Sequence, residues 1–335
     1  MKKKIIIFGA TGNTGNYLVK YASSFFDKEH YEIIATGRKS TNVFESMDVP
    51  YYQVDINKES DFNVLPKDNV FAVILLAAKI PSYMNNYDPK EYLTTNILGA
   101  FNVLEFCRKN NVDRILYTQT VFDISLSVVE GKKIDPYTPK SFSYKGDHAM
   151  YVISKNTAQE LIKHYHEEYG IKSFIFRLPT IYNYSPYQYY FPNGIKTLRP
   201  VYQMINNAIE GKDIELWGDP NYSKDMVHVY DFSQMLCKAV LTDRNEGIYN
   251  VGTGIPVTMQ EQIETIIEVF GDKNKSKIVY KPEKKSGGGF LMDIENARTE
   301  LGYQPEYTCK KLFENYKEEM AKNTFAELRL NSVKE

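Results

Sequence analysis

Short runs of apolar, mostly β-branched residues recur along the first half of the chain and alternate with segments of helical character. Continuous apolar strands of this kind are typical of a sheet that is covered by helices on both faces. The pattern therefore predicts an α/β fold built on a doubly wound parallel sheet. The predicted strands cover residues 5–8, 31–36, 51–54, 70–78, 114–118 and 173–177.

Two longer segments, 91–111 and 150–170, carry apolar residues at helical spacing, and the second ends in Gly170, a common helix stop signal. We expect both to be crossover helices. After residue 178 the alternation gives way to turn formers, aromatic residues and shorter elements. We therefore predict one domain over residues 1–178 and a smaller lobe over residues 179–335, with strands that interleave with those of the first.

The balance of charged residues indicates what kind of partner the protein binds. Lys plus Arg number 41 and Asp plus Glu 42, with no basic block beyond residues 2–4, so we expect no nucleic-acid partner. No stretch approaches the roughly 20 apolar residues of a membrane helix, and the apolar run near the N-terminus is too short for a signal sequence. We expect a cytoplasmic protein with a small-molecule partner and no membrane contact. Cys107, Cys237 and Cys309 are widely spaced and predict neither disulfides nor a metal site.

Three glycines, Gly9, Gly12 and Gly15, stand between the first predicted strand and a helical segment, in the sequence GATGNTG. In this setting the glycines allow a tight turn and a close approach of the backbone, and the helix N-terminus favours a pyrophosphate. The loop therefore predicts that residues 1–178 form a Rossmann-type dinucleotide-binding domain and leaves residues 179–335 to bind substrate.

The end of the second predicted strand bears on the choice of dinucleotide. An acidic residue here usually meets a free ribose 2′-hydroxyl, whereas this chain has Arg38 and Lys39. A guanidinium and an ammonium suit a 2′-phosphate. The sequence therefore favours NADP over NAD.

Tyr151 and Lys155 are four residues apart and share one face of the predicted helix 150–170. A tyrosine with an ordinary pKa near 10 is a poor base at neutral pH. A neighbouring ammonium stabilises the phenolate, which can bring the pKa of the tyrosine into a working range. The pair is a candidate acid/base centre.

Further segments extend this pattern along nearly the whole chain, and the sequence as a whole resembles the extended branch of the short-chain dehydrogenase/reductase superfamily. That branch contains nucleotide-sugar epimerases, dehydratases and reductases. The segments that carry the resemblance, besides the glycine loop and the Tyr-Lys pair, are VDI, LLAAK, TNILGAFNVLEFCRKNNVDRILYT, FRLPTIY, LWGDPNYSKDMVHVYDF, GIYNVGTGIPVTMQEQ and MDIENARTELGYQP.

The resemblance implies a role for each matching residue. Tyr151 would exchange a proton with a sugar hydroxyl or keto group, and Lys155 would bind the nicotinamide ribose and lower the pKa of the tyrosine. The family has a catalytic triad of a hydroxyl residue, a tyrosine and a lysine. Thr118 would supply the hydroxyl, and Thr120 is the weaker candidate for this position. The resemblance also implies a nucleotide-sugar substrate and a homodimer that forms through the helices 91–111 and 150–170.

The positions implied to contact the ligands form two sets. Cofactor contacts are implied, besides Tyr151 and Lys155, at Gly9, Thr11, Gly12, Asn13, Thr14, Gly15, Arg38, Lys39, Asp55, Ile56, Ala77, Ala78, Lys79, Asn96 and Leu178, and substrate contacts at Thr120, Thr180 and Lys224.

Departures from the family pattern bear on the reaction. Related 4,6-dehydratases have an Asp-Glu pair after the triad threonine, whereas this chain has Gln119 and Thr120. Neither can serve as a general acid at neutral pH, so dehydration is not expected. Phe122 and Asp123 replace the Tyr-Gly of the family. Lys224 replaces a diphosphate-binding arginine, which keeps the charge but loses the bidentate fork.

Three functions stay open. The first is an epimerase that oxidises a sugar hydroxyl transiently, and the second is an NADPH-dependent keto-sugar reductase. The third is a non-catalytic NADP sensor, which the Tyr-Lys pair disfavours. The role of His148, close before Tyr151, is also open between proton transfer and an ordinary loop position, and Trp217, Tyr182 and Tyr184 either stack on a ligand or form the core of the lobe.

Overall fold

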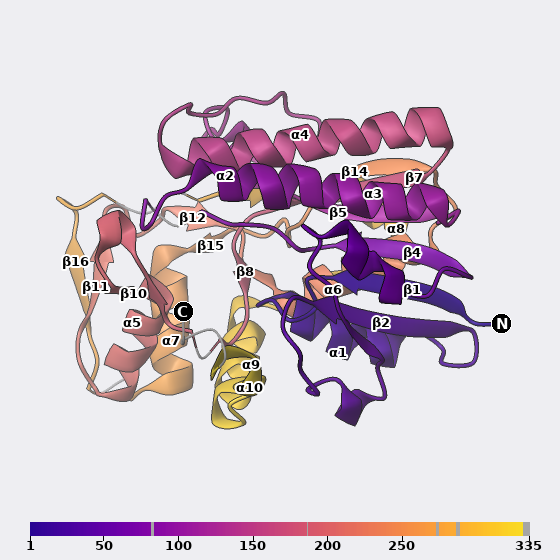
Figure 1. Ribbon diagram of the computed structural model, residues 1–335. Helices are drawn as coiled ribbons and strands as arrows, with labels where there is room; N and C mark the ends of the chain where they lie inside the picture. Colours follow the sequence, from indigo (N-terminus) through magenta and orange to yellow (C-terminus); the bar gives the residue numbers. More distant parts are fainter. Residues whose placement is uncertain (82–83, 186, 273–274, 286–288, 331–335) are drawn as a thin grey trace.

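The computed structural model describes residues 1–81, 84–185, 187–272, 275–285 and 289–330, and it is built around a seven-stranded sheet (Figure 1). Every strand pairs in parallel with its neighbours, in the order β14-β7-β5-β4-β1-β2-β3. The strands are β1 (Lys3–Phe8), β2 (Tyr31–Gly37), β3 (Tyr51–Gln53), β4 (Val70–Leu75), β5 (Arg114–Thr120), β7 (Lys172–Leu178) and β14 (Glu246–Asn250).

The doubly wound sheet predicted from the sequence is confirmed, and all six predicted strands are present. Two of them end more than one residue from the expected position. β4 stops at Leu75, so residues 76–78 form the start of a loop at the sheet edge, and β5 continues to Thr120. The seventh strand, β14, was not predicted, because its five residues carry little of the apolar pattern and it is placed by pairing with β7.

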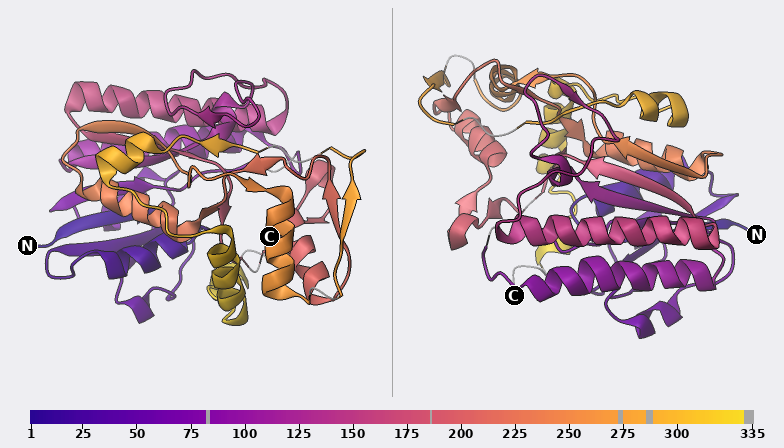
Figure 2. Two further views of the ribbon diagram at one scale, coloured as in Figure 1. Left: turned by 180° about the vertical axis from the view of Figure 1, so that it is seen from behind. Right: turned by 90° about the horizontal axis from the view of Figure 1, so that it is seen from above.

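Helices cover both faces of the sheet (Figures 1 and 2). β1 shows why: Ile5 and Ile7 belong to a core with α1 (Gly15–Phe25) and α6 (Val229–Leu241), while Ile6 and Phe8 belong to a second core with α3 (Ala100–Lys109) and α4 (Gly146–Tyr169). Successive side chains of a strand point to opposite faces, so each apolar strand needs a helix layer on either side.

The two long predicted helices differ in detail from expectation. The first consists of α2 (Pro89–Tyr92), the π-helical segment η3 (Leu93–Gly99) and α3. Short π-helical segments often occur at functional sites. The second, α4, begins at Gly146 instead of residue 150 and ends at Tyr169, where it is capped by Gly170, whose positive φ of 71° suits a glycine. The earlier start places His148 on the helix.

Residues after 178 contribute to both parts of the molecule. β14 is a strand of the sheet, and α6 covers one face of it. α5 (Pro200–Ile209), α7 (Met259–Phe270) and α9 (Cys309–Ala321) pack around a separate apolar core. In Figure 1, α5 and α7 lie at the left beside the paired strands β11 (Ile214–Trp217) and β16 (Ile278–Lys281). β14, from the part of the chain after residue 178, thus pairs with β7, which ends at Leu178.

The remaining elements are short. They are β6 (Lys133–Ile134), β8 (Ile181–Tyr182), β9 (Tyr189–Tyr190), β10 (Thr197–Leu198), β12 (Ser223–Lys224), β13 (Val227–His228), β15 (Val257–Thr258), β17 (Leu291–Met292), α8 (Glu295–Leu301) and α10 (Glu327–Leu330), with 3-10 turns at η1 (Glu45–Met47), η2 (Glu59–Val64), η4 (Val121–Ile124) and η5 (Pro192–Gly194). All three cysteines are free and buried.

Candidate active site

A cavity of about 1980 Å³ lies between the carboxyl ends of the sheet strands and the C-terminal lobe. Ligands of open α/β sheets bind at this edge, and the volume exceeds the roughly 300–1,000 Å³ of a site for one small molecule. The cavity therefore has room for a dinucleotide together with a second ligand. Predicted ligand contacts on its wall are Gly9, Thr11, Gly12, Asn13, Arg38, Lys39, Asp55, Ile56, Ala77, Ala78, Lys79, Thr180 and Lys224.

The glycine loop has the shape that a pyrophosphate requires. Gly9 has a φ of 87°, and a Cβ there would lie 2.6 Å from the Ala77 nitrogen. A Cβ at Gly15 would overlap the Gly9 carbonyl oxygen. α1 begins at this loop and has no acidic residue in its first turn, so its N–H groups and dipole favour an anion. These residues fit the predicted dinucleotide.

Arg38 and Lys39 are exposed on the cavity wall where β2 ends. The preceding Gly37 packs against Thr11 of the glycine loop, since a Cβ at Gly37 would lie 2.5 Å from the Thr11 hydroxyl. The end of β2 is therefore adjacent to the phosphate cradle. Gln53 holds the Arg38 backbone through a hydrogen bond from its Nε2 to the carbonyl oxygen, at 3.0 Å.

Asn96 binds the protein backbone instead of lining the cavity. Its Oδ1 accepts the Lys79 N–H at 2.7 Å, and its Nδ2 donates to the Lys79 carbonyl at 3.0 Å and to Ser154 Oγ at 2.9 Å. Ser154 in turn donates to the Tyr151 carbonyl at 2.7 Å. Asn96 thus ties the loop after β4 to the helix that carries Tyr151.

Other predicted residues also lie off the described cavity wall. These are Thr14, Gly15, Leu178, Asn96, Thr118, Thr120, Tyr151 and Lys155. Their contacts with ligands stay predictions.

Burial dominates the electrostatics of the Tyr-Lys pair. Lys155 is 2% exposed, and burial lowers its pKa to about 7. Its Nζ lies 4.0 Å from the centroid of the Tyr117 ring, and among the described residues no carboxylate pairs with it. Burial raises the pKa of Tyr151 to about 12. Among the protein side chains, the expected lowering of the Tyr151 pKa by Lys155 is therefore not found.

The hydroxyl groups of Thr118 and Thr120 have different surroundings. A hydrogen-bonding interaction with the Thr120 side chain lowers the pKa of Tyr151, against the larger effect of burial. The Thr120 hydroxyl oxygen accepts the Phe122 N–H at 3.2 Å, which leaves its proton to donate. Thr118 instead donates to the Leu75 carbonyl at 3.4 Å. The role of Thr118 as triad hydroxyl stays a prediction.

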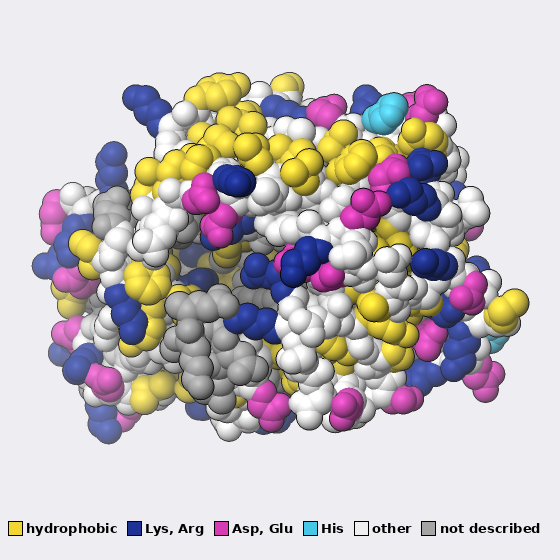
Figure 3. All heavy atoms as spheres, viewed as in Figure 1, with side chains coloured by type: hydrophobic (Ala, Val, Ile, Leu, Met, Phe, Trp, Pro, Cys, Tyr) yellow, Lys and Arg dark blue, Asp and Glu magenta, His cyan; other side chains and the backbone are white. Residues whose placement is uncertain are grey.

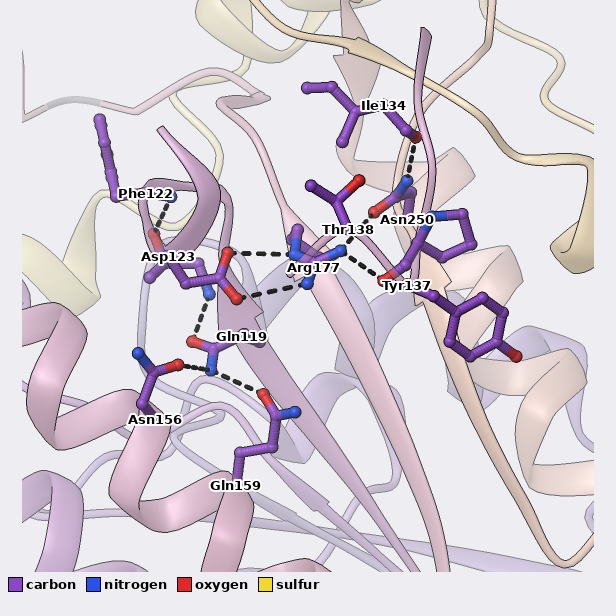
Figure 4. A network of polar contacts seen from close by, with 12 residues as sticks. Gln119, Phe122, Asp123, Ile134, Tyr137, Thr138, Asn156, Gln159, Arg177 and Asn250 are labelled. Atoms are coloured by element: carbon purple, nitrogen blue, oxygen red, sulfur yellow. Dashed lines mark hydrogen bonds and ion pairs between the residues drawn. The ribbon is translucent and has the colours of Figure 1, made fainter. Parts of the chain in front are cut away.

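Gln119 is turned into the protein, as Figure 4 shows. Its Oε1 accepts the Thr120 N–H at 2.7 Å, and its Nε2 donates to Asn156 at 3.1 Å and to Gln159 at 2.8 Å, both on α4. Gln119 is buried and both atoms of its amide are hydrogen-bonded, so it fixes the end of β5 on α4. Neither Gln119 nor Thr120 supplies an acid to the site.

The same figure shows Asp123 facing Arg177. The guanidinium Nε and Nη2 bind the two carboxylate oxygens at 3.0 and 3.3 Å, and Nη1 donates to the Pro136 carbonyl at 2.6 Å and to Asn250 at 3.3 Å. The pair joins the ends of β5, β7 and β14. Burial raises the pKa of Asp123, and Arg177 opposes that shift. Sequence reasoning missed this pair, although it noted Asp123 as a departure.

His148 lies in the first turn of α4 and on the cavity wall, so the interpretation as a loop histidine is wrong. Its Nδ1 lies 3.1 Å from Asp147 Oδ1. The ring also meets the Phe122 ring edge to face, with centroids 5.2 Å apart. Sequence reasoning missed Asp147, which the helix start would have revealed.

The lobe side of the cavity is basic and aromatic. Lys224, Arg199 and Lys285 line it, and Lys and Arg side chains gather around the hollow in Figure 3. Asp225 anchors the Lys224 strand by accepting the N–H groups of Thr253 at 2.7 Å and of Gly254 at 2.9 Å. This charge suits a phosphorylated ligand.

The aromatic residues singled out in the sequence divide between the two alternatives. Trp217 is 48% exposed on the cavity wall, where Lys284 Nζ lies 4.5 Å from the centroid of its ring, whereas Tyr182 and Tyr184 belong to the buried core of the lobe. Tyr182 reaches the wall as well.

Two features are absent from the residues that the structure describes. No group of three or more His, Cys, Asp or Glu side chains is placed to hold a metal ion. No described helix combines the length and the apolar character needed to cross a membrane.

Comparison with known proteins identifies the family of this chain. The profile of the NAD dependent epimerase/dehydratase family matches residues 5–252. The chain is 25% identical to a dTDP-glucose 4,6-dehydratase of Haemophilus influenzae, over 92% of this chain and 94% of that protein.

Solved structures share the fold. A UDP-glucose 4-epimerase of Thermotoga maritima with UDP-glucose has a TM-score of 0.72 at 23% identity, covering 96% of this chain and 99% of its own. A dTDP-glucose 4,6-dehydratase of Bacillus anthracis in complex with NAD has a TM-score of 0.73 at 22% identity, covering 96% and 97%.

Proposed function

The chain belongs to the NAD dependent epimerase/dehydratase family, whose members are enzymes of the extended short-chain dehydrogenase/reductase type, and from this premise we propose that it epimerises a nucleotide-activated sugar. The observation that carries the proposal is that α4 bears Tyr151 and Lys155 on one face, while Gln119 and Thr120 stand where related 4,6-dehydratases have an Asp-Glu pair. Gln119 is engaged with α4, and Thr120 is a hydroxyl. The epimerase is therefore favoured over the dehydratases among the relatives.

The chemistry at the sugar follows from the side chains of this chain. A bound dinucleotide supplies the hydride acceptor and donor. Tyr151 takes the proton of the sugar hydroxyl as the carbon–hydrogen bond is oxidised, and it returns the proton when the opposite face is reduced. Thr120 donates a hydrogen bond to the phenolate, and Lys155 in its cationic form adds a positive charge. Gln119 and the Asp123–Arg177 pair hold this arrangement in place.

The lobe residues support a nucleotide diphosphate on the substrate. Lys224 and Arg199 present cations to the cavity, and the exposed Trp217 ring offers a surface for a base. Because Lys224 stands where the family has an arginine, its contact with phosphate is a point-charge contact without a fork.

We propose that NADP is the preferred dinucleotide, with NAD as the alternative. Arg38 and Lys39 are exposed on the cavity wall next to the glycine loop, and both are cations. Arg38→Asp should weaken NADP binding by about 10- to 100-fold, since a charge-assisted hydrogen bond is worth about 1.5–3 kcal/mol, and it should weaken NAD binding far less. Equal loss of both affinities, measured by calorimetry, would contradict the assignment.

The function is tested by incubating the purified enzyme with a sugar panel of UDP-glucose, UDP-glucuronic acid and dTDP-glucose, each with NAD⁺ or NADP⁺, and following the products by proton NMR. An epimer formed without net reduction of the cofactor supports the proposal. A 4-keto-6-deoxy product would show a dehydratase instead. Tyr151→Phe should reduce turnover by at least about 100-fold, and His164→Gln, on the exposed face of α4, serves as the control.

The second candidate is an NADPH-dependent keto-sugar reductase, and Arg38 is the observation that favours it. In that case Tyr151 donates its proton to the carbonyl oxygen, and the cofactor is consumed. Stoichiometric loss of NADPH absorbance with a keto-sugar, and no epimer from the sugar panel, would select this candidate.

A further inference from the structure

Three ionisable side chains follow one another along a single face of α4: His148, Tyr151 and Lys155. Spacings of three and four residues place side chains on the same side of a helix. With a rise of 1.5 Å per residue, His148 lies about 4.5 Å along the axis before Tyr151, and Lys155 about 6 Å after it. His148 and Lys155 therefore flank Tyr151 on opposite sides.

Asp147 fixes the His148 ring in the form that accepts a proton. The carboxylate is 2% exposed, its Oδ1 lies 3.1 Å from His148 Nδ1, and its Oδ2 accepts the Met84 N–H at 3.0 Å. A carboxylate acceptor on Nδ1 places the proton of a neutral imidazole on that nitrogen. His148 Nε2 then carries the lone pair, which is the arrangement of a base oriented by an acid.

Phe122 fixes the position of the ring from the other side. Its ring meets His148 edge to face at 5.2 Å and Phe290 at 6.1 Å. Phe122 follows Thr120 and donates its N–H to the Thr120 hydroxyl. The turn that brings Thr120 to Tyr151 thus also holds the imidazole, and His148 and Phe122 both line the cavity.

We propose that His148, oriented by Asp147, is a second catalytic acid/base, which exchanges the proton on a carbon next to the carbonyl formed in the reaction. This inference rests on the proposed function, because only oxidation of the sugar hydroxyl creates that carbonyl. The substrates are nucleotide sugars with a hydrogen on the neighbouring ring carbon. The enzyme would then have an additional activity, which is exchange of the proton on that carbon with solvent.

The step balances without a further reagent. His148 Nε2 takes the proton, and the electron pair of the carbon–hydrogen bond forms a carbon–carbon double bond. The carbonyl π electrons move onto oxygen, which Tyr151, protonated by the first step, stabilises with a hydrogen bond. Return of a proton from His148 restores the carbonyl, and nothing is oxidised or reduced in the exchange.

The experiment uses the sugar panel in D₂O, with two separate readouts. Hydride transfer is followed by epimer formation or by the change in cofactor absorbance, and proton exchange is followed by the mass and NMR position of incorporated deuterium. The wild-type enzyme should incorporate deuterium on a carbon adjacent to the oxidised one. His148→Gln should lower incorporation by about 100-fold or more and hydride transfer by less than tenfold, since general acid/base catalysis contributes about 10²–10⁴.

Two variants sharpen the assignment. Asp147→Asn should lower incorporation by about tenfold with little change in KM, which a purely structural role would not produce. His164→Gln, an exposed histidine of the same helix, should leave both readouts unchanged.

Each adverse outcome is distinct. Hydride transfer without deuterium in the wild type, or equal deuterium in the wild type and His148→Gln, overturns the role of His148 and leaves the proposed function standing. Absence of hydride transfer with every sugar and both cofactors overturns the proposed function, and the inference falls with it.

Discussion

Asp123 and Arg177 are 54 residues apart in the sequence and form a buried two-pronged ion pair, with an Nε–Oδ1 distance of 3.0 Å. The carboxylate has no exposed surface and the guanidinium is 6% exposed. Because the pair joins the carboxyl ends of β5 and β7, it holds the turn that carries Thr120 in front of Tyr151.

Removing one member of this pair should cost more than removing both. Asp123→Ala is expected to lower the free energy of unfolding by about 3–5 kcal/mol, since it leaves the Arg177 charge buried without its partner. The double variant Asp123→Leu/Arg177→Met should lose less than either single change. Urea unfolding of the wild type, Asp123→Leu, Arg177→Met and the double variant measures this coupling, and additive losses would show that the pair is not a unit.

The two threonines of β5 should differ in their effect on catalysis. Thr120→Val is expected to reduce kcat by about 10- to 100-fold, because it removes the hydrogen bond that lowers the pKa of Tyr151. The loss should shrink as the pH rises toward the pKa of the tyrosine. Thr118→Val should have the smaller effect, since its hydroxyl donates to the Leu75 carbonyl. A larger loss in Thr118→Val would restore the assignment made from sequence spacing.

The buried Lys155 is expected to lower the free energy of unfolding of the protein. Its pKa falls from 10.5 to about 7 on burial, so between these values the unfolded chain binds more protons and stability rises with pH. Below pH 7 the full cost is present, at most about 5 kcal/mol at 1.36 kcal/mol per unit. Lys155→Met should therefore raise the unfolding free energy at pH 7, abolish activity and flatten the pH dependence up to pH 10. A less stable variant at pH 7 would refute this.

The helices α2, α3 and α4 carry a band of apolar side chains in Figure 3, and we propose that it forms the homodimer contact implied by the family resemblance. Leu98 is 56% exposed and Phe101 is 40% exposed. Leu98→Glu/Phe101→Glu should convert a dimer to a monomer in light scattering after size exclusion. The control is Leu241→Glu, since Leu241 is 46% exposed on α6 and across the sheet. If the wild-type protein is a monomer in the same light-scattering measurement, the proposal is wrong.

Local features of this site could be predicted from the sequence. The glycine loop, the Tyr151–Lys155 pair and the cations Arg38 and Lys39 each lie within a few residues of a predicted strand or helix end. Parallel strands bring such ends to one edge of the sheet. Gly9, Gly12, Arg38 and Lys39 do line the cavity, and the binding of a dinucleotide there stays a prediction.

Partner choice among buried polar groups could not be predicted in this way. Whether Thr118 or Thr120 meets Tyr151 depends on where β5 ends and on which direction each hydroxyl points. The start of α4, which decides the place of His148, lacks an apolar pattern that would mark it. The Asp123–Arg177 pair and the Gln119 contacts exist only because β5, β7, β14 and α4 converge at one point.

By itself the sequence determined the class of fold and the chemistry available, because apolar periodicity and glycine spacing act through local backbone geometry. The tertiary structure alone decided how that chemistry is arranged. It buried Lys155, turned Gln119 away from the site, brought Thr120 to Tyr151 and set His148 on Asp147. These outcomes depend on desolvation and on hydrogen-bond geometry between distant segments, which side-chain identity and spacing do not specify.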